Sequence, residues 1–549
     1  MKSWFNKGEH WIWMSSSMVS ISLVLVLGLI AMITYRGAVH FWPHTVYEFE
    51  VTQNSKAELV VGELRDYKSR VYTNPESGEQ EEGTQYLIRV GNRDVYGIDF
   101  RWINDDLITS DMTNLAEDIL VIERYKYGHV YGRLVSAELG EQKLLKSESE
   151  DIIYDEINKQ VELSNEVREQ IRSIEKYDIG AINYQMEELR FEEKKLRSKG
   201  EFTADEAARL AAEKAELQAR FKVFKAETQL LYKELKSFGQ VTVEISNGQM
   251  LSVPIDKIVT MWQPNDMSFV EKLGYFGSSL GNFLTDDPRE ANTEGGIFPA
   301  MVGTITMVLL MTILVTPMGV IAAIYMREYA KDGPLLRMVR ISINNLAGVP
   351  SIVFGIFGLG FFVYILGGSI DDLFYDYRAP SPTFGTPGLL WASLTMALLT
   401  LPVVIVSTEE GLSRIPRSLR EGGLSLGATK AEVIAKIVLP MATPAIMTGL
   451  ILAIARAAGE VAPLMLVGVV KLAPELPIDG IAPFIHLDRK FMHLGFHIYD
   501  VGFQSPNVEA AQPLVYATSL LLVVIIVGLN LGAISIRNRL REKYKQLDG

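Results

Sequence analysis

The segment "REGGLSLGATKAEVIAKIVLP", residues 420–440, lies between two long apolar runs although it is charged and helix-forming. A glycine in its middle lets the backbone change direction sharply, so the pattern predicts two short helices joined by a tight turn at the surface of a membrane domain. Such an element can seat in a groove on a soluble partner. The positions that define the pattern are Glu421, Gly427, Ala428, Ile437, Leu439 and Pro440.

The composition places this segment in a membrane protein that carries one large polar insert. The 549 residues are 48% hydrophobic and 22% charged, with a mean hydropathy of +0.14. Residues 45–290 hold 31 of the 53 basic and 47 of the 66 acidic residues, so this insert carries −16 and the remainder +3. The absence of cysteine excludes disulfides, thiolate metal sites and a catalytic thiol, and the acidic balance argues against a nucleic-acid partner.

Six apolar runs are long enough to cross a membrane as helices. We interpret the first as an uncleaved anchor, because no small-residue cleavage site follows it. Lys and Arg concentrate in the connections 327–340 and 409–438 and in the C-terminal tail, which indicates that these lie in the cytoplasm. Both termini are then cytoplasmic, and the insert lies outside the inner membrane. The expected spans are 18–35, 297–326, 341–367, 387–408, 439–470 and 512–536.

The insert is expected to fold as an α+β domain with a helical arm. Residues 45–140 and 238–264 contain β-rich runs, and Asn247-Gly248 is a hairpin turn signal. Residues 141–237 are predicted to form a helical hairpin that turns near residues 198–200. A spacer and a docking surface are both compatible with this arm.

Apolar residues in the second half of the arm follow a 4-3 heptad register, which predicts a coiled coil with an antiparallel partner at about 148–199. The register positions are Leu210, Leu217, Phe221, Phe224, Leu231 and Leu235. The opposing face is expected to come from Ile157, Val161, Val167, Ile171 and Ile174.

The spacing E-(x)5-G-(x)9-I-x-L-P in residues 421–440 resembles the coupling loop of ABC importer permeases, with Gly422 and Gly423 where alanine is usual. Further motifs resemble the A-type permease subunit (PstA family) of bacterial phosphate ABC importers. They are "GGIFPAMVGTITMVLLMTILVTPMGVIAAIYMREYAKDG" (295–333), "NNLAGVPSIVFGIFGLGFF" (344–362), "ARAAGEVAPLMLVG" (455–468) and "YDVGFQSPNVEAAQPLVYATSLLLVVIIVGLNL" (499–531). The resemblance covers about 291–545 and the first span, and it does not extend to the insert.

The resemblance implies a mainly α, six-span membrane fold. Residues 1–44 would form a cytoplasmic segment and the first helix, and residues 291–549 a five-helix permease domain with the coupling loop at 411–438. It also implies a heterodimer with a second phosphate permease subunit, two ATPase subunits inside, a phosphate-binding protein outside and a surrounding lipid membrane. Because the chain contains no G-x-x-x-x-G-K-[ST] motif, ATP would be used by the partner subunits, and we expect this chain to bind no cofactor and not to be an enzyme.

Arg456 and Glu460 are the only charged residues deep in the fifth expected span. Charges inside a membrane are costly and usually face a cavity or a partner, and residues four apart share one face of a helix. Arg456 would offer phosphate a cation with forked donors, and Glu460 would hold that fork or ease release of the anion. A polar lock between spans would use the same two residues. His486, His493 and His497 lie among aromatic residues and Asp488, and we do not expect them to form a metal site.

Other classes of protein account for only part of the sequence. A channel or secondary transporter would explain charges inside the membrane but not the coupling-loop spacing. A membrane-anchored sensor or scaffold with an outer coiled-coil arm would explain the insert but not five clustered spans. Within the transporter class, a permease for another oxyanion such as sulfate or molybdate stays open, because only residues 456–465 and 495–515 favour phosphate.

Overall fold

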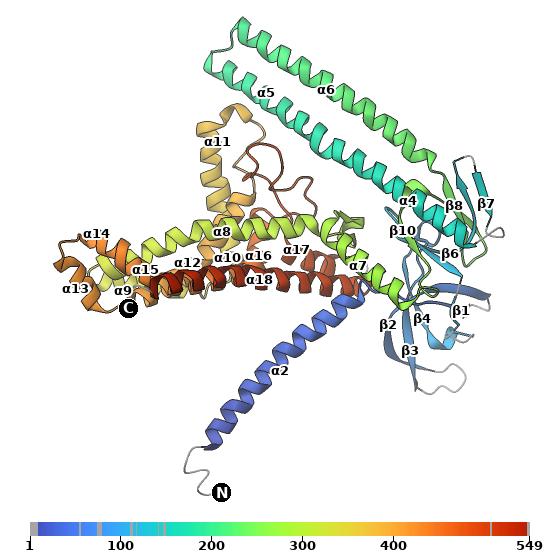
Figure 1. Ribbon diagram of the computed structural model, residues 1–549, viewed down its shortest axis with the longest axis horizontal. Coiled ribbons are helices and arrows are strands. Elements are labelled where there is room, and N and C mark those ends of the chain that lie inside the picture. Colours follow the sequence, from blue (N-terminus) through green and yellow to red (C-terminus); the bar gives the residue numbers. More distant parts are fainter. Residues whose placement is uncertain are drawn as a thin grey trace. The chain divides into compact units, whose positions relative to one another are not determined.

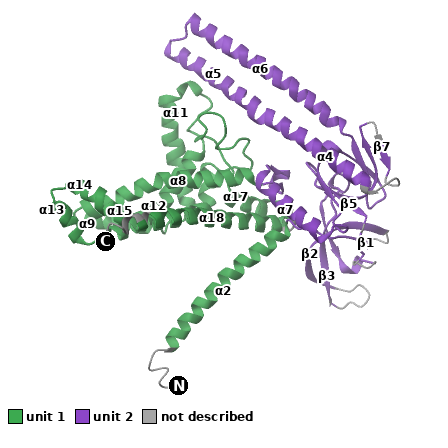
Figure 2. Ribbon diagram, viewed as in Figure 1, with its two compact units in different colours: residues 1–40, 297–549 green, residues 41–296 purple. Residues whose placement is uncertain are grey.

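The computed structural model separates the chain into two compact units. It describes residues 9–53, 56–73, 80–109, 114–116, 118–140, 142–145, 150–505 and 508–545. One unit combines Met1–His40 with Ile297–Gly549, and the other is Phe41–Gly296 (Figure 2). Residues 1–8 of the expected cytoplasmic segment lie outside the described residues.

The first unit is helical, and in the described part of the chain six helices are long and apolar enough to cross a membrane (Figure 1). They run over His10–Val39, Phe298–Tyr329, Ser351–Phe374, Leu389–Ser413, Lys430–Gly459 and Ala511–Arg539. The main elements are α2 (Glu9–Val39), α8 (Phe298–Ile324), η5 (Tyr325–Tyr329), α9 (Pro334–Leu346), α10 (Ser351–Phe357), η6 (Gly358–Gly367), α11 (Gly368–Phe374), α12 (Leu389–Ser413), α13 (Arg417–Ser425), α14 (Lys430–Val433), η8 (Ile434–Val438), α15 (Leu439–Gly459), α16 (Ala462–Val467), α17 (Leu494–Tyr499), η9 (Asp500–Gln504) and α18 (Val508–Lys545).

Two expected spans have the wrong bounds. The span expected at 439–470 ends at Gly459, because a proline at 463 lacks an N–H and its ring would clash with the Gly459 carbonyl in a continuous helix. The span expected at 341–367 begins only at Ser351, because Pro350 has the same effect on the carbonyl of Leu346, where the separate helix α9 ends.

The core of this unit is formed by α8, α12 and α15, which pack closely through small residues. A Cβ atom on Gly319 of α8 would lie 2.6 Å from Val404 Cγ1 of α12. A Cβ atom on Gly449 of α15 would lie 2.5 Å from Ser407 Cβ of α12. Small residues let membrane helices approach until their backbones nearly touch, and van der Waals packing then holds them together. The buried apolar side chains around these contacts include Met307, Met311, Val315, Leu389, Met396, Leu450 and Ile454.

The second unit contains two antiparallel sheets. The first has the order β1-β2-β3-β4, and the second has the order β10-β5-β6-β8-β9 with β7 also paired to β6. The Asn247-Gly248 turn joins β8 to β9, and Gly248 has φ 79°. The strands are β1 (Val46–Gln53), β2 (Lys56–Thr73), β3 (Gln80–Arg89), β4 (Phe100–Asn104), β5 (Ile119–Arg124), β6 (His129–Leu139), β7 (Gln142–Leu145), β8 (Gln240–Glu244), β9 (Met250–Pro254) and β10 (Ile258–Trp262).

The arm consists of α4 (Glu150–Ser173), η2 (Ile174–Ile179) and α5 (Gly180–Lys199), which run out from the sheets, and α6 (Ala204–Ser237), which returns (Figure 1). The chain turns at Gly200, where φ is 71°. The expected helical start at 141 is wrong, because residues 142–145 form strand β7.

The side chains that the arm buries differ from the expected seam. Ile157 and Val161 pack on the second sheet rather than on α6. Val167 and Ile171 do pack against Leu235 of α6. The helices are therefore paired near the sheets as expected, whereas a coiled coil along the whole arm stays a prediction.

One side chain joins the start of β1 to the segment that follows β10. Asn265 follows β10, and its amide accepts a hydrogen bond from the Val46 N–H (3.1 Å) and donates to the Val46 carbonyl (2.7 Å), although the two residues are 219 positions apart. The same amide donates to the Ala116 carbonyl at 3.0 Å. Asn265 thus replaces a strand partner for the first residue of β1.

The segment that leaves this unit is fixed by ion pairs. It forms a small hairpin of β11 (Pro288–Arg289) and β12 (Glu294–Gly295), and Glu290, Ala291 and Asn292 between them all have positive φ. Such conformations each cost about 1–3 kcal/mol in a non-glycine residue, so other contacts must offset them. The ion pairs that the hairpin makes include Arg93–Glu290, Arg89–Glu294 and Arg289–Glu123, each at 2.7 Å.

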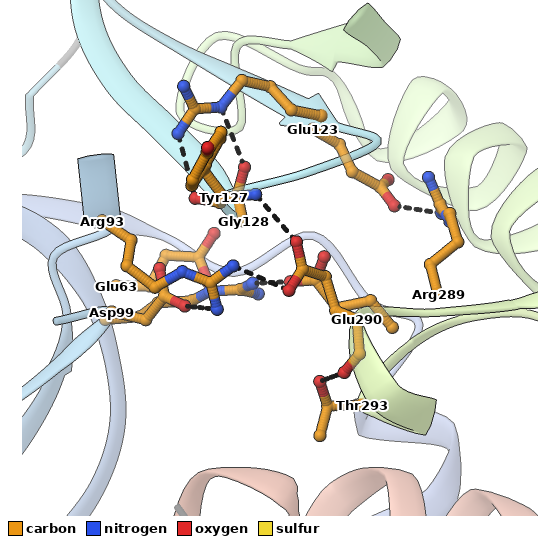
Figure 3. A network of polar contacts seen from close by, with 12 residues as sticks. Glu63, Arg93, Asp99, Glu123, Tyr127, Gly128, Arg289, Glu290 and Thr293 are labelled. Carbon is orange, nitrogen blue, oxygen red and sulfur yellow. Dashed lines mark hydrogen bonds and ion pairs between the residues drawn. The ribbon is translucent and has the colours of Figure 1, made fainter. Parts of the chain in front are cut away.

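Glu290 is held in this hairpin from two sides. Figure 3 shows its carboxylate between the Arg93 guanidinium and the Tyr127 N–H, which donates at 2.8 Å. Although burial opposes ionisation, these hydrogen bonds hold the pKa of the Glu290 carboxyl below its usual range. The charged carboxylate therefore stabilises the strained turn.

We predict that residues 41–296 fold alone and that Asn265→Ala weakens this fold. The substitution removes the amide that pairs with the Val46 N–H and the Ala116 carbonyl, which costs about 2 kcal/mol. Circular dichroism should show mixed helix and strand and a cooperative melt, with a lower midpoint for Asn265→Ala. The control Asn158→Ala, at an exposed position of α4, should melt like the parent. A disordered spectrum, or equal midpoints, would contradict this account.

Candidate functional site

The segment between α12 and α15 forms two short helices joined by a turn. Helix α13 ends near Gly427, whose φ of 87° takes the chain into the next turn. Thr429 then caps α14, and a capping box links it to Glu432, whose N–H donates to Thr429 Oγ1 at 3.3 Å. Helix α14 continues through the π-helical turn η8 into α15. The coupling-loop region thus joins directly to a membrane-spanning helix.

The two glycines that depart from the usual alanines play different parts. A Cβ on Gly423 would lie 2.9 Å from Val433 Cγ2 and 3.0 Å from Ile437 Cδ1, so α13 packs closely on α14 and η8 at this point. A Cβ on Gly422 would meet nothing within 4 Å. Both glycines lie within the nine-residue helix α13, so their low helix propensity does not prevent the helix from forming.

Charged residues fix this segment to the end of α8. Arg420 Nη2 lies 2.8 Å from Glu328 Oε1 of η5, and the same guanidinium donates to the carbonyls of Leu412 (2.8 Å) and Ile415 (2.6 Å). The ammonium of Lys430 bonds to the Glu328 carbonyl. The Arg420 and Glu328 side chains are 19% and 10% exposed, so water screens their attraction little. The segment between α12 and α15 is therefore held firmly to η5, at the end of α8.

The segment exposes leucines as well as charged residues. Leu426 is 90% exposed, and Leu424 and Leu419 are exposed as well. Burying a leucine fully in a partner contributes about 1.5–3 kcal/mol. A segment that is fixed on its inner side and apolar at its tip is suited to insertion into a groove.

A cavity of about 280 Å³ lies beside this segment, between α9, η5 and α12. Its lining includes Arg340 and Glu409, whose charged groups are 2.6 Å apart, together with Asn344 and Ile343. The partner of Arg340 lies on another helix, so this ion pair ties α9 to α12.

Arg456 and Glu460 lie at the other end of α15. Arg456 is in the last turn of the helix, whereas Glu460 follows its end with φ −80° and ψ 140°. The expectation that both lie within one helix is therefore wrong, but the side chains still approach, with Arg456 Nε 3.6 Å from Glu460 Oε1. Their side chains are 34% and 21% exposed. Both groups remain accessible enough to meet a ligand.

The connection between α16 and α18 is held by internal polar contacts. His486 Nε2 lies 2.9 Å from Asp479 Oδ1, and His493 Nδ1 accepts from the Gly495 N–H at 3.1 Å. Burial lowers the pKa of His493 to about 3, so its ring is neutral. Another ion pair, which the sequence did not suggest, joins Lys471 Nζ to the buried Asp500 at 3.0 Å.

The structure brings three of the expected coupling residues together. Ala428, Ile437 and Leu439 pack in one apolar cluster, and Pro440 lies in the first turn of α15. Arg456 is 16 residues further along the same helix, a distance of about 24 Å. Sequence reasoning missed Glu328, which lies beside Arg327 at the end of a long apolar run.

Comparison with known proteins identifies a family and several relatives of this chain. A model of the binding-protein-dependent transport system inner membrane component matches residues 315–545. The phosphate transport system permease protein PstA of Mycobacterium leprae is 33% identical over 270 residues, which are 48% of this chain and 79% of that protein. A probable PstA of Methanocaldococcus jannaschii is 29% identical over 255 residues, 46% of this chain and 79% of that protein.

Among solved structures, an inward-facing MetNI methionine ABC transporter matches with a TM-score of 0.32 and 19% identity, over 45% of this chain and 94% of that chain. The resemblance to PstA permeases that the motifs indicated is confirmed by the curated relatives. The fold class is likewise confirmed as a multi-pass helical membrane permease with an inserted α+β region. The chain therefore belongs to the family of binding-protein-dependent transport system inner membrane components, as a permease subunit of an ABC importer.

Proposed function

We propose that this chain is the A-type permease subunit of an ATP-driven phosphate importer and forms half of its translocation pathway. The observation that supports phosphate is the 33% identity to a phosphate permease over 79% of that relative's length. The other half of the pathway would come from a second, related permease subunit. Two ATPase subunits would bind inside the cell, and an extracytoplasmic phosphate-binding protein would deliver the substrate. Both termini would lie in the cytoplasm of a multi-pass inner membrane protein.

The coupling segment would transmit the movement of the ATPase. The exposed Leu424 and Leu426 would seat in the ATPase, while Arg420 holds the segment to Glu328 at the end of α8. Movement of the segment would then shift α8 and α15 together, because the helix from Lys430 to Gly459 is continuous. Arg456, at the far end of that helix, would move with it.

Arg456 would supply the cation that phosphate meets in the membrane. Phosphate carries about −1.5 to −2 charges near neutral pH, and its transfer into a low dielectric is costly without a compensating charge. The guanidinium is one-third exposed, and its contact with Glu460 is loose at 3.6 Å, so its donors are available to an oxyanion. Glu460 would weaken the attraction enough for the anion to leave.

The first prediction concerns the substrate. In cells that lack their own phosphate importer, this chain with its partner subunits should restore uptake of radiolabelled phosphate. A tenfold excess of sulfate or molybdate should not compete. A tenfold difference in affinity between two anions corresponds to about 1.4 kcal/mol of binding free energy. Competition by either anion would move the assignment to that oxyanion. Failure of any oxyanion to enter, with the complex assembled, would favour a sensor or scaffold.

The second prediction concerns coupling. Gly427→Val places a β-branched residue at φ 87°, which costs about 1–2 kcal/mol and should distort the turn. Uptake should fall about tenfold while the chain still inserts into the membrane. Gly422→Ala, which meets no neighbouring atom, should transport like the parent. Normal uptake by Gly427→Val with the ATPase bound would show that this segment does not couple.

The third prediction separates a pathway role for Arg456 from a polar lock. Arg456→Gln removes the charge and should lower phosphate uptake about tenfold or more with the complex intact, because bonds to charged groups contribute about 1.5–3 kcal/mol. Lys should rescue it only in part, since it lacks the forked donors. Arg539→Gln, at an exposed position near the end of α18, is the matched control and should transport normally.

The double variant Arg456→Gln with Glu460→Gln decides between the two roles. A lock would be relieved by removing both charges, because no unpaired charge then remains buried. Normal assembly and native uptake in the double variant would therefore refute the pathway role. Normal assembly without uptake is the expected result.

A further inference from the structure

Helix α7 (Phe269–Thr285) has three different faces. At 3.6 residues per turn, large apolar side chains occupy an arc of about 140°, which holds Phe269, Val270, Leu273, Phe276, Leu280 and Phe283. Glu271, Ser278 and Asn282 lie on the opposite side. The only charged residues of the helix are Glu271 and Lys272.

One edge of the apolar arc packs on the second unit. The Tyr275 ring lies 4.8 Å from the Trp262 ring at the end of β10, and the buried Phe283 ring lies 5.1 Å from Phe41. Phe276 is 6.2 Å from the same Phe41 ring. These aromatic contacts fix the rotation of α7 about its own axis.

The other edge of the arc has no cover within the described chain. Phe269 is 71% exposed, Val270 76%, Leu273 53% and Leu280 37%. The positions 269, 273 and 280 fall on one line along the helix because they are spaced by about one and two turns. A fixed helix that leaves a continuous row of large apolar side chains in water is costly, and such surfaces mark an interaction site.

The chain places this row close to the membrane. Trp42 follows the end of the first spanning helix α2, at Val39, by three residues, so its Cα lies within about 11 Å of that helix end. The Trp42 ring packs on α7, 6.0 Å from Phe269 and 6.3 Å from Phe276. Tryptophan is enriched where a membrane helix meets the lipid headgroups. The apolar row of α7 therefore begins beside a tryptophan that is only three residues from the end of a membrane span.

We propose that α7 is an interfacial helix whose exposed row, Phe269, Val270, Leu273 and Leu280, is immersed in the headgroup region of the bilayer. The occupant of this surface is lipid, because its apolar row opposite a polar face and its covalent distance from α2 match a helix lying in the membrane plane. The insert is attached to the membrane through the two spanning helices that flank it, and α7 then anchors it at a third place. This proposal does not depend on the transported substrate.

The absence of cysteine in the sequence allows a direct test with single labels. Val270→Cys and Leu273→Cys would be labelled with an environment-sensitive fluorophore in the full chain, reconstituted in vesicles of phosphatidylethanolamine and phosphatidylglycerol. Iodide quenching at both positions should be about fivefold weaker than at the control, because the row lies 5–10 Å inside the interface. Quenching by lipids that carry a spin label near the headgroup should be correspondingly strong.

Val223→Cys is the matched control, because Val223 is a valine on the arm helix α6 with a similar exposure of 65%. Its label should be open to iodide and insensitive to the lipid quencher. Equal iodide quenching at Val270 and Val223 would overturn the proposal. Protection of Val270 from iodide without quenching by spin-labelled lipid would also overturn it, since protein rather than lipid would then cover the row.

Discussion

The side chain of Asn265 makes the contact on which the insert depends. An insert between two successive membrane helices begins and ends at the same face of the membrane, so its ends must come back together. Asn265 contributes to this by pairing with both backbone groups of Val46 and with the Ala116 carbonyl. A half-buried amide with these three bonds made is specific, since displacement leaves a polar group unpaired. The strained and ion-paired hairpin after α7 then leads the chain out of the domain.

Closed ends explain how the permease tolerates so large an insertion. The entropic cost of a loop grows only with the logarithm of its length, and a folded insert with neighbouring ends adds little strain to its host. The insertion after α2 also disturbs the helical unit little, because the apolar window of α2 is exposed throughout and makes few contacts that could be lost. Where α2 does touch the unit, near its end, Gly37 approaches the Ala517 backbone and Arg36 lies over the Tyr516 ring at 5.4 Å. The packed core of α8, α12 and α15 is formed without the first span.

The sequence predicted the parts of the fold that depend on local pattern. Apolar length indicated the membrane helices, and the Asn247-Gly248 turn joins two strands as expected. Strand β2 was missed because most of its second half is polar and solvent-exposed, so it lacks the alternation that marks a half-buried strand. The helix end at Gly459 was missed because prolines such as Pro402 and Pro444 lie inside helices here. A proline alone therefore does not locate the end of a helix. In α15 the end is located by Gly459 together with the proline four residues later.

The candidate site was predictable only where its partners are near in sequence. The spacing of four residues correctly suggested that Arg456 and Glu460 approach, although an arginine side chain reaching past a helix end, rather than a shared helix face, brings them together. The contact of Arg420 with Glu328 spans 92 positions and carried no local signal. That contact matters more for the proposed coupling, because it joins α13 to the end of the span Phe298–Tyr329 through a poorly hydrated ion pair. Charge and packing thus make the membrane-surface segment rigid, and a rigid segment can pass displacement to α8 and α15 without absorbing it in its own backbone.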